Sequence, residues 1–243
     1  MSGHSKWSKV KHQKKSVDLA RGKIFTKFAN AIIIAVKAGG GSDRDTNFKL
    51  RLAIERARSV NMPNENIQRA IDHAKGAGKE SEISEVLYEA FAAKSVGILI
   101  KCATDNKQRS VAEIKNILER HGGVLAESGA VSHFFNQLGV IEIDKNEQNS
   151  ERILELSAES GAIDIEESES GVLVYTNPSE LHKISELLIK GGLKVKSSEL
   201  IFKPVATIPV KESDDNRKID NLIDALEERE DVTAVFTNRM RGY

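Results

Sequence analysis

The chain has 243 residues, with 36 Lys and Arg against 36 Asp and Glu. This length is sufficient for two or three compact domains. The only cysteine, Cys102, excludes a disulfide framework and a thiolate metal cluster. The longest uncharged apolar stretch near the N-terminus, residues 28–36, is far shorter than the ~20 residues that a membrane span needs. We therefore expect a cytoplasmic protein that does not span a membrane.

The net charge of zero is the sum of two oppositely charged parts. Residues 1–79 hold 17 Lys and Arg against 6 Asp and Glu, a net charge of +11. Residues 80–243 hold 19 Lys and Arg against 30 Asp and Glu, a net charge of −11. This asymmetry indicates one part that faces a polyanion and another that is separately solvated. It argues against a single uniform enzyme domain.

Residues 1–15 contain five lysines and no acid, and their one large apolar side chain is Trp7. Such a segment buries too little apolar surface to order itself. We predict a flexible basic arm.

The pattern from Ser16 to Gly76 predicts a small three-helix domain. Gly39-Gly40-Gly41 ends the first helix, Asn47 caps the second and Pro63 opens the third. Apolar residues at three- and four-residue spacing mark an inward face on each helix. The inward residues are Ile24, Phe28, Ile32 and Ala35, then Leu50, Ala53, Ile54 and Ala57, and finally Ile67, Ala70 and Ile71.

Beyond a linker at residues 76–80, the pattern alternates between strands and helices. Strands are expected at 84–92, 96–104, 131–135, 139–143, 162–167, 171–176, 193–202, 206–210 and 232–237, and helices at 106–121, 149–160, 178–190 and 214–229. The nearly continuous apolar run of residues 96–104 indicates a central strand.

The predicted fold class is α+β and multi-domain. A helical domain occupies residues 1–79, and the remainder forms two ferredoxin-like α/β domains. One α/β domain, residues 138–203, is inserted into the other, which is built from residues 80–137 and 204–243. The outer domain is expected to combine two βαβ units, with strands 96–104, 131–135, 206–210 and 232–237.

Catalytic and metal-binding patterns are weak in this sequence. The triple glycine is followed by Ser42-Asp43-Arg44 and lacks the lysine of a phosphate-binding loop. The six histidines have no metal-ligand spacing beside an acid, and Cys102 lies within an apolar strand, where a free cysteine is an inert packing group. We predict no catalytic residues, no metal, no cofactor and no small-molecule substrate.

The basic residues near the N-terminus are the candidate nucleic-acid contacts, because lysines along an arm neutralise phosphates and release counterions. Trp7 adds a ring that can stack on an exposed base. On the second helix, Lys49 and Arg56 lie two turns apart, as do Arg51 and Arg58, on a face expected to be solvent-exposed. The full candidate set is Lys6, Trp7, Lys9, Lys11, His12, Lys14, Lys15, Arg21, Lys23, Lys27, Lys49, Arg51, Arg56 and Arg58.

Several blocks of the sequence closely resemble the YebC/PmpR family. They are Gly3-His4-Ser5-Lys6-Trp7, Arg21-Gly22-Lys23-Ile24-Phe25-Thr26-Lys27, Gly39-Gly40-Gly41, Asn61-Met62-Pro63, Thr104-Asp105-Asn106 with Arg109, His121-Gly122-Gly123, and Asp231-Val232 with Val235 and Asn238. The chain departs from the family at residues 90–97, which replace a glycine- and proline-rich loop. His133 stands where the family commonly has an aromatic residue such as tryptophan.

The resemblance implies a helical domain followed by two α/β domains, one interrupting the other, in a non-enzymatic cytoplasmic regulator. Bacterial members are labelled probable transcriptional regulators that bind DNA, whereas mitochondrial relatives activate translation on the ribosome. The chain starts at the first matching block, so we expect the bacterial form. A DNA-binding transcriptional regulator is the first expectation, and a translation factor that binds ribosomal or transfer RNA is the second. An enzyme ranks last, and the oligomeric state is left open.

Overall fold

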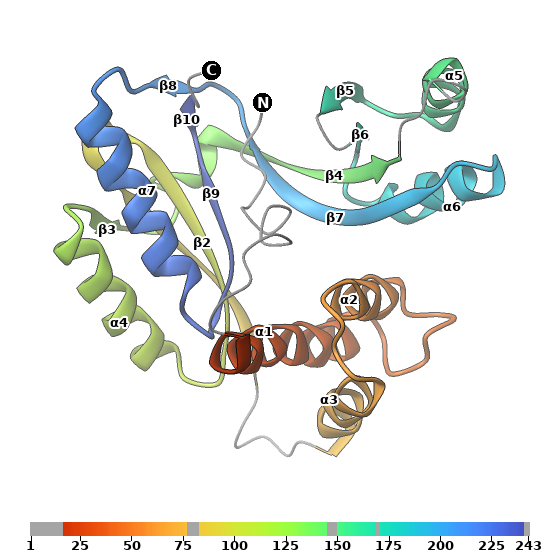
Figure 1. Cartoon of the computed structure of the whole chain (residues 1–243), viewed down its shortest axis with the longest axis horizontal. Helices are drawn as coiled ribbons and strands as arrows, with labels where there is room; N and C mark the ends of the chain where they lie inside the picture. The colour runs from red at the N-terminus through yellow and green to blue at the C-terminus, as the bar shows by residue number, and fades with distance from the viewer. Residues whose placement is uncertain (1–16, 77–82, 145–149, 169–170, 241–243) are drawn as a thin grey trace. The chain divides into compact units, whose positions relative to one another are not determined.

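A computed structural model describes residues 17–76, 83–144, 150–168 and 171–240, with side chains omitted at 17–21, 150 and 168 (Figure 1). The predicted arm lies outside these residues. The chain divides into two compact units, residues 136–203 and the remainder on either side of them. The predicted α+β class is confirmed, with seven α-helices and three sheets among the described residues.

The helical domain consists of α1 (Val17–Ala38), α2 (Phe48–Ser59) and α3 (Asn64–Gly76), as the sequence predicts. α1 packs against both other helices. The predicted inward residues of α2 and α3 are all buried, and in α1 Ile32 and Ala35 are buried whereas Ile24 and Phe28 are half-buried. Except for Ile24, these side chains form a core of their own, with Ile33, Val36 and Met62.

The turn between α1 and α2 depends on Asn47, whose side chain is buried. Its Oδ1 accepts the Leu50 N–H at 3.0 Å, which confirms the predicted N-cap, and its Nδ2 donates to the carbonyls of Ala35 at 2.8 Å and Gly41 at 2.6 Å. A Cβ at Gly39 would lie 2.0 Å from Asn47 Oδ1. Glycine is therefore required at that position, because any side chain would displace the cap.

The discontinuous α/β domain contains a four-stranded sheet. Its strands are β1 (Ser84–Phe91), β2 (Gly97–Thr104), β3 (Val124–Ala126) and β9 (Val232–Thr237), in the order β3-β1-β2-β9. β2 is antiparallel to both of its neighbours and almost entirely buried, so the predicted central strand is confirmed. The helices α4 (Lys107–Arg120) and α7 (Ser213–Glu227) lie side by side (Figure 1). Their side chains Ile114, Leu118 and Leu222 pack with Ile98 and Ile100 of β2 in one buried core.

The predicted strand at residues 131–135 is wrong. Ser132–Phe134 is a 3₁₀ turn, and the strand that pairs with β1 on the side opposite β2 is β3, at residues 124–126. The buried Glu89 carboxylate accepts the backbone N–H groups of Gly129 at 2.8 Å, Val131 at 2.5 Å and Ser132 at 2.9 Å. These N–H groups point at one carboxylate and so cannot form a strand ladder.

The predicted strand at residues 206–210 is only partly correct. β8 (Ile208–Pro209) pairs in parallel with β10 (Arg239–Met240) in a separate two-stranded sheet. Pro204 precedes this segment and Pro209 lies within it, and neither has an N–H to donate to a ladder. The main sheet of the discontinuous domain is therefore built in the order ββαβ before the insertion and αβ after it. The expected combination of two βαβ units is wrong.

The hairpin turn between β1 and β2 lies within the segment that departs from the family pattern. Lys94 and Ser95 both have positive φ angles, 58° and 59°, which non-glycine residues adopt at a cost. Lys94 Nζ lies 3.3 Å from carboxylate oxygens of Glu212 and of Asp215, at the start of α7. These ion pairs hold the turn without glycine.

The inserted unit has the ferredoxin-like order that the sequence predicts. Its elements are β4 (Phe135–Ile143), α5 (Ser150–Ser160), β5 (Asp164–Ser168), β6 (Gly171–Thr176), α6 (Leu181–Lys190) and β7 (Val195–Pro204). The sheet order is β5-β6-β4-β7, with β6 antiparallel to β4 and β5. The first and last strands, β4 and β7, are therefore neighbours.

We predict that Asn47→Ala lowers the free energy of unfolding by about 2–4 kcal/mol, because it removes the three hydrogen bonds of one buried side chain. Urea titration followed by circular dichroism would measure this. The matched control is Asn106→Ala, which removes the single N-cap bond of α4 to Arg109 N and should cost about 1 kcal/mol. Equal losses in the two variants would contradict the role of Asn47.

Candidate nucleic-acid interface

The described side chains of the helical domain, residues 22–76, include ten Lys and Arg against five Asp and Glu. Lys23 on α1 and Lys49 and Arg58 on α2 are exposed. None of these three forms an ion pair with another side chain of the described residues. They are therefore available to a polyanion at little desolvation cost.

The other two predicted arginines of α2 are less accessible. Arg51 is half-buried, donates to the carbonyls of Arg44 at 3.1 Å and Asp45 at 2.7 Å, and lies over the Phe48 ring at 5.9 Å. Arg56 is half-buried as well. The solvent-facing surface predicted for α2 is thus carried mainly by Lys49 and Arg58, with Arg51 supporting the loop before the helix.

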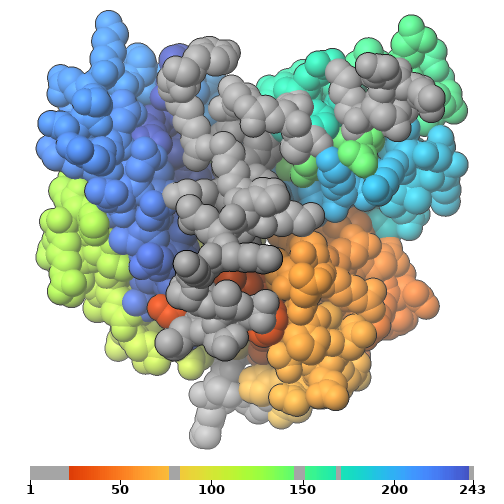
Figure 2. Space-filling model, in the orientation of Figure 1, coloured from red at the N-terminus to blue at the C-terminus, as the bar shows by residue number. Residues whose placement is uncertain are grey.

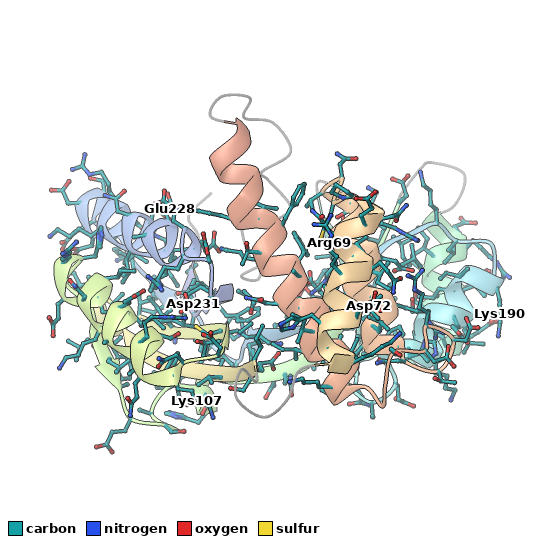
Figure 3. All side chains as sticks on the ribbon, turned by 90° about the horizontal axis from the view of Figure 1, so that it is seen from below. Arg69, Asp72, Lys107, Lys190, Glu228 and Asp231 are labelled. Atoms are coloured by element: carbon teal, nitrogen blue, oxygen red, sulfur yellow. The ribbon has the colours of Figure 1, made fainter. Side chains whose placement is uncertain are left out.

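The third helix contributes paired charges. Arg69 lies 3.4 Å from Glu65, and Lys75 lies 3.6 Å from Asp72. Figure 3 labels Arg69 and Asp72 on this helix, and Figure 2 shows α2 and α3 together on the surface. Because both cations of these pairs face an acid on the same helix, they add little net positive charge to α3.

Lys27, one of the candidate nucleic-acid contacts, does not face solvent. Its side chain is only 6% exposed, and Nζ donates to the backbone carbonyl of Glu227, the last residue of α7. Burial is the main cause that lowers the pKa of Lys27 to about 8, against the opposing attraction of Glu227 and Asp231. Lys27 is therefore removed from the surface that the helical domain presents here.

The remaining predicted contacts cannot be placed. Arg21 lies in α1, but its side chain is outside the described part of the chain. Seven predicted residues precede α1 and lie outside the described residues: Lys6, Trp7, Lys9, Lys11, His12, Lys14 and Lys15.

The structure brings together two sequence blocks for which we predicted no chemical role. Ser110 Oγ donates to Asp231 Oδ2 at 2.5 Å and lies 2.8 Å from Thr104 Oγ1. Arg229 Nε donates to Asp231 Oδ1 at 2.9 Å, and the Arg229 guanidinium also pairs with Glu113. Figure 3 labels Asp231, which lies just beyond the end of α7.

Asp231 is a buried carboxylate held in its charged form. Burial raises its pKa, but the hydrogen bonds from Arg229 and Ser110 outweigh burial and lower the pKa below the ordinary value. Nearby Cys102 is fully buried, and desolvation raises its pKa to about 12. The thiol is therefore protonated and unreactive, as expected of a packing cysteine.

A cavity of about 250 Å³ adjoins this network. Thr26 and Asn30 of α1 line one side, and the other side consists of Ile83, Ala103, Thr104, Asp105, Arg109, Glu230 and Asp231. Arg109 is paired with Asp105 at 2.7 Å. Among the described residues, no group of three or more His, Cys, Asp or Glu side chains is placed to hold a metal ion.

Two family models match almost the whole chain. The TACO1/YebC N-terminal domain matches residues 5–77, and the TACO1/YebC second and third domain matches residues 83–239. The chain belongs to the TACO1/YebC family. The family resemblance predicted from the sequence blocks is confirmed.

Similar proteins carry a regulatory name. A probable transcriptional regulatory protein of Aquifex aeolicus is 38% identical over 98% of this chain and 95% of its own length. One from Nitratiruptor is 42% identical over 98% of this chain and 99% of its own length. The crystal structure of a conserved hypothetical protein from Aquifex aeolicus superposes with a TM-score of 0.87 at 37% identity, covering 98% of each chain.

We predict that Asp231→Asn destabilises the protein at neutral pH by about 2 kcal/mol, because Arg229 loses a charged partner in a buried setting. The native pKa of Asp231 is lowered, so its contribution is present above the unfolded pKa of about 4 and is lost as pH falls through the native pKa. Urea titrations of both chains at pH 7 and at pH 3 test this. A difference in stability that stays constant between these pH values would contradict the prediction.

Proposed function

We propose that this protein is a cytoplasmic, non-enzymatic regulator that binds nucleic acid through its helical domain and the basic arm before it, with DNA as the first target. The observation that carries the proposal is the exposure of three cations on α1 and α2, Lys23, Lys49 and Arg58, which form no ion pair within the described residues. The regulatory names of the relatives support the same conclusion. No described helix is long and apolar enough to cross a membrane.

The mode of binding that these residues support is contact with phosphates. Exposed lysine and arginine heads on two helices attract a polyanion and release its counterions, whatever the base sequence. The net charge of −11 on residues 80–243 repels the same polyanion. Bound nucleic acid is therefore expected to meet the helical domain first.

A second candidate function is binding to structured ribosomal or transfer RNA, and the charges on α3 favour it. In a helix-turn-helix, the N-terminal residues of the second helix contact base edges in the major groove. α3 follows α2 after a short turn, but its first turn carries Glu65 and its cations are paired. An acid at that position disfavours contact with base edges in the DNA major groove. Recognition through shape and phosphate contacts, by contrast, is possible with folded RNA.

We predict that replacing Lys23, Lys49 and Arg58 with Gln weakens binding and flattens the salt dependence. With each residue meeting one phosphate, the slope of log K against log salt falls by up to about 3. Titration of a fluorescent DNA duplex across a salt series would measure the slope. The control replaces Lys115, Arg152 and Lys190 with Gln, three exposed cations outside the helical domain. Equal slopes for the two triple variants would contradict the proposal.

We also predict that a chain lacking residues 1–15, and so five lysines, has a salt slope smaller by up to about 4 on duplex DNA. Undiminished binding would remove the arm from the mechanism.

Co-sedimentation with ribosomes at increasing salt, measured in parallel, distinguishes DNA from ribosomal RNA as the target. Association with ribosomes that persists at moderate salt, together with no sequence preference on DNA, would replace the first target with the second.

A further inference from the structure

The helix α1 contacts both the helical domain and the discontinuous domain. It packs against α2 and α3 through the core of the helical domain, and it also contacts β2 and β9 of the discontinuous domain. The two hydrophobic cores contain no residue in common. Contact between the helical domain and the sheet therefore does not arise from one continuous apolar core.

Three side chains of α1 near the end of α7 are polar. Thr26 and Asn30 line the cavity of about 250 Å³, and Lys27 between them reaches the carbonyl at the end of α7. A polar and incompletely filled contact is typical of domain interfaces that open reversibly. We call this contact between α1 and the discontinuous domain the docked state.

Burial of the charged Lys27 side chain makes the docked state less favourable. The charged groups around it are Glu227 and Asp231 at the end of α7 and just beyond it, the Cys102 thiol on β2, and Lys23 one turn earlier on α1. Desolvation is the largest influence and outweighs the attraction of both acids, so the pKa of Lys27 is lowered from 10.5 to about 8. Below pH 8, docking therefore holds a charged ammonium in a place that disfavours its charge.

Opening the contact would return Lys27 to the surface where the sequence places it. Residues four apart on a helix lie one above the other on the same face, so Lys27 continues the row begun by the exposed Lys23. In the open state both ammonium groups would be hydrated and available to one phosphate strand.

We propose that docking of α1 on the discontinuous domain and phosphate binding by Lys27 exclude each other, so that nucleic acid selects an open form of the protein. This proposal rests on the proposed nucleic-acid binding and specifies how that binding is regulated. Lys27 is then an additional contact of the same basic surface, released when α1 separates from the end of α7.

The direction of the pH dependence is set by linkage. The docked state has the lower Lys27 pKa, so the open state binds more protons between pH 8 and 10.5, and docking strengthens as pH rises through this window. Between pH 7 and pH 9 the docked-to-open ratio rises about tenfold for this one group. Because binding requires the open form, affinity for DNA falls by the same factor when the docked form predominates at both pH values.

The test compares the full chain with Lys27→Gln, which keeps a hydrogen-bond donor and removes the charge. Affinity for a duplex of about 20 base pairs, long enough to span the helical domain, is measured at pH 7 and pH 9 at constant salt. We expect the native chain to lose about tenfold more affinity over this range than Lys27→Gln. The N-terminal amine titrates in the same range but contributes equally to both chains. Lys23→Gln, the matched control, should bind more weakly at both pH values and keep the native pH response.

A second measurement reports the docking directly. Spin labels at Ser59→Cys on α2 and Lys115→Cys on α4, neither of them a proposed phosphate contact, give the distance across the contact, and the buried Cys102 is protected from labelling. We expect duplex DNA to replace the docked distance with a longer, broader distribution. Two results would overturn this proposal and leave the proposed function standing. One is a DNA-bound chain that keeps the docked distance, and the other is an equal pH response in the native chain and in Lys27→Gln. Failure of every chain to bind the duplex overturns the proposed function and this proposal with it.

Discussion

Polar side chains separate the core of the helical domain from the core of the discontinuous α/β domain. Lys27 is buried where α1 meets the discontinuous domain and therefore needs a hydrogen-bond partner, which is the Glu227 carbonyl, and Thr26 and Asn30 beside it line a cavity. The end of α7 and the Asp231 network supply polar groups there. The arrangement of the helical domain against the sheet therefore depends on a few specific contacts, whereas each core is stabilised by its own apolar residues.

Much of the fold is determined by local pattern. The three N-terminal helices, the N-cap at Asn47 and the inward faces of α2 and α3 were predictable because capping and helical periodicity act within a few residues. The same holds for the inserted unit, whose six elements alternate in a regular order. The true structure of residues 131–135 was not predictable, since a single carboxylate some forty residues earlier, Glu89, captures the N–H groups there.

In the candidate interface, too, features set by nearby residues were predictable and features set by distant residues were not. Lys23, Lys49 and Arg58 are exposed as the helical pattern indicates, because the face of a helix is a local property. Burial of Lys27 depends on a carbonyl 200 residues further along the chain. The blocks around Thr104 and Asp231 matched the family, but only the fold shows that they meet. Charge identified the cations, and tertiary structure decides which of them reach solvent.

The neighbouring strands β4 and β7 carry the chain into and out of the inserted unit, and just outside it Val205 N donates to Phe134 O at 2.8 Å. The outer domain is therefore interrupted in sequence while remaining continuous in space. During synthesis its sheet has β1, β2 and β3 early, but β2 lacks one neighbour until β9 emerges. The inserted unit, whose residues are all available by 203, can complete its fold before the domain that contains it. The hydrophobic core of the discontinuous domain therefore cannot form completely until α7 and β9, which follow the insertion, have been synthesised.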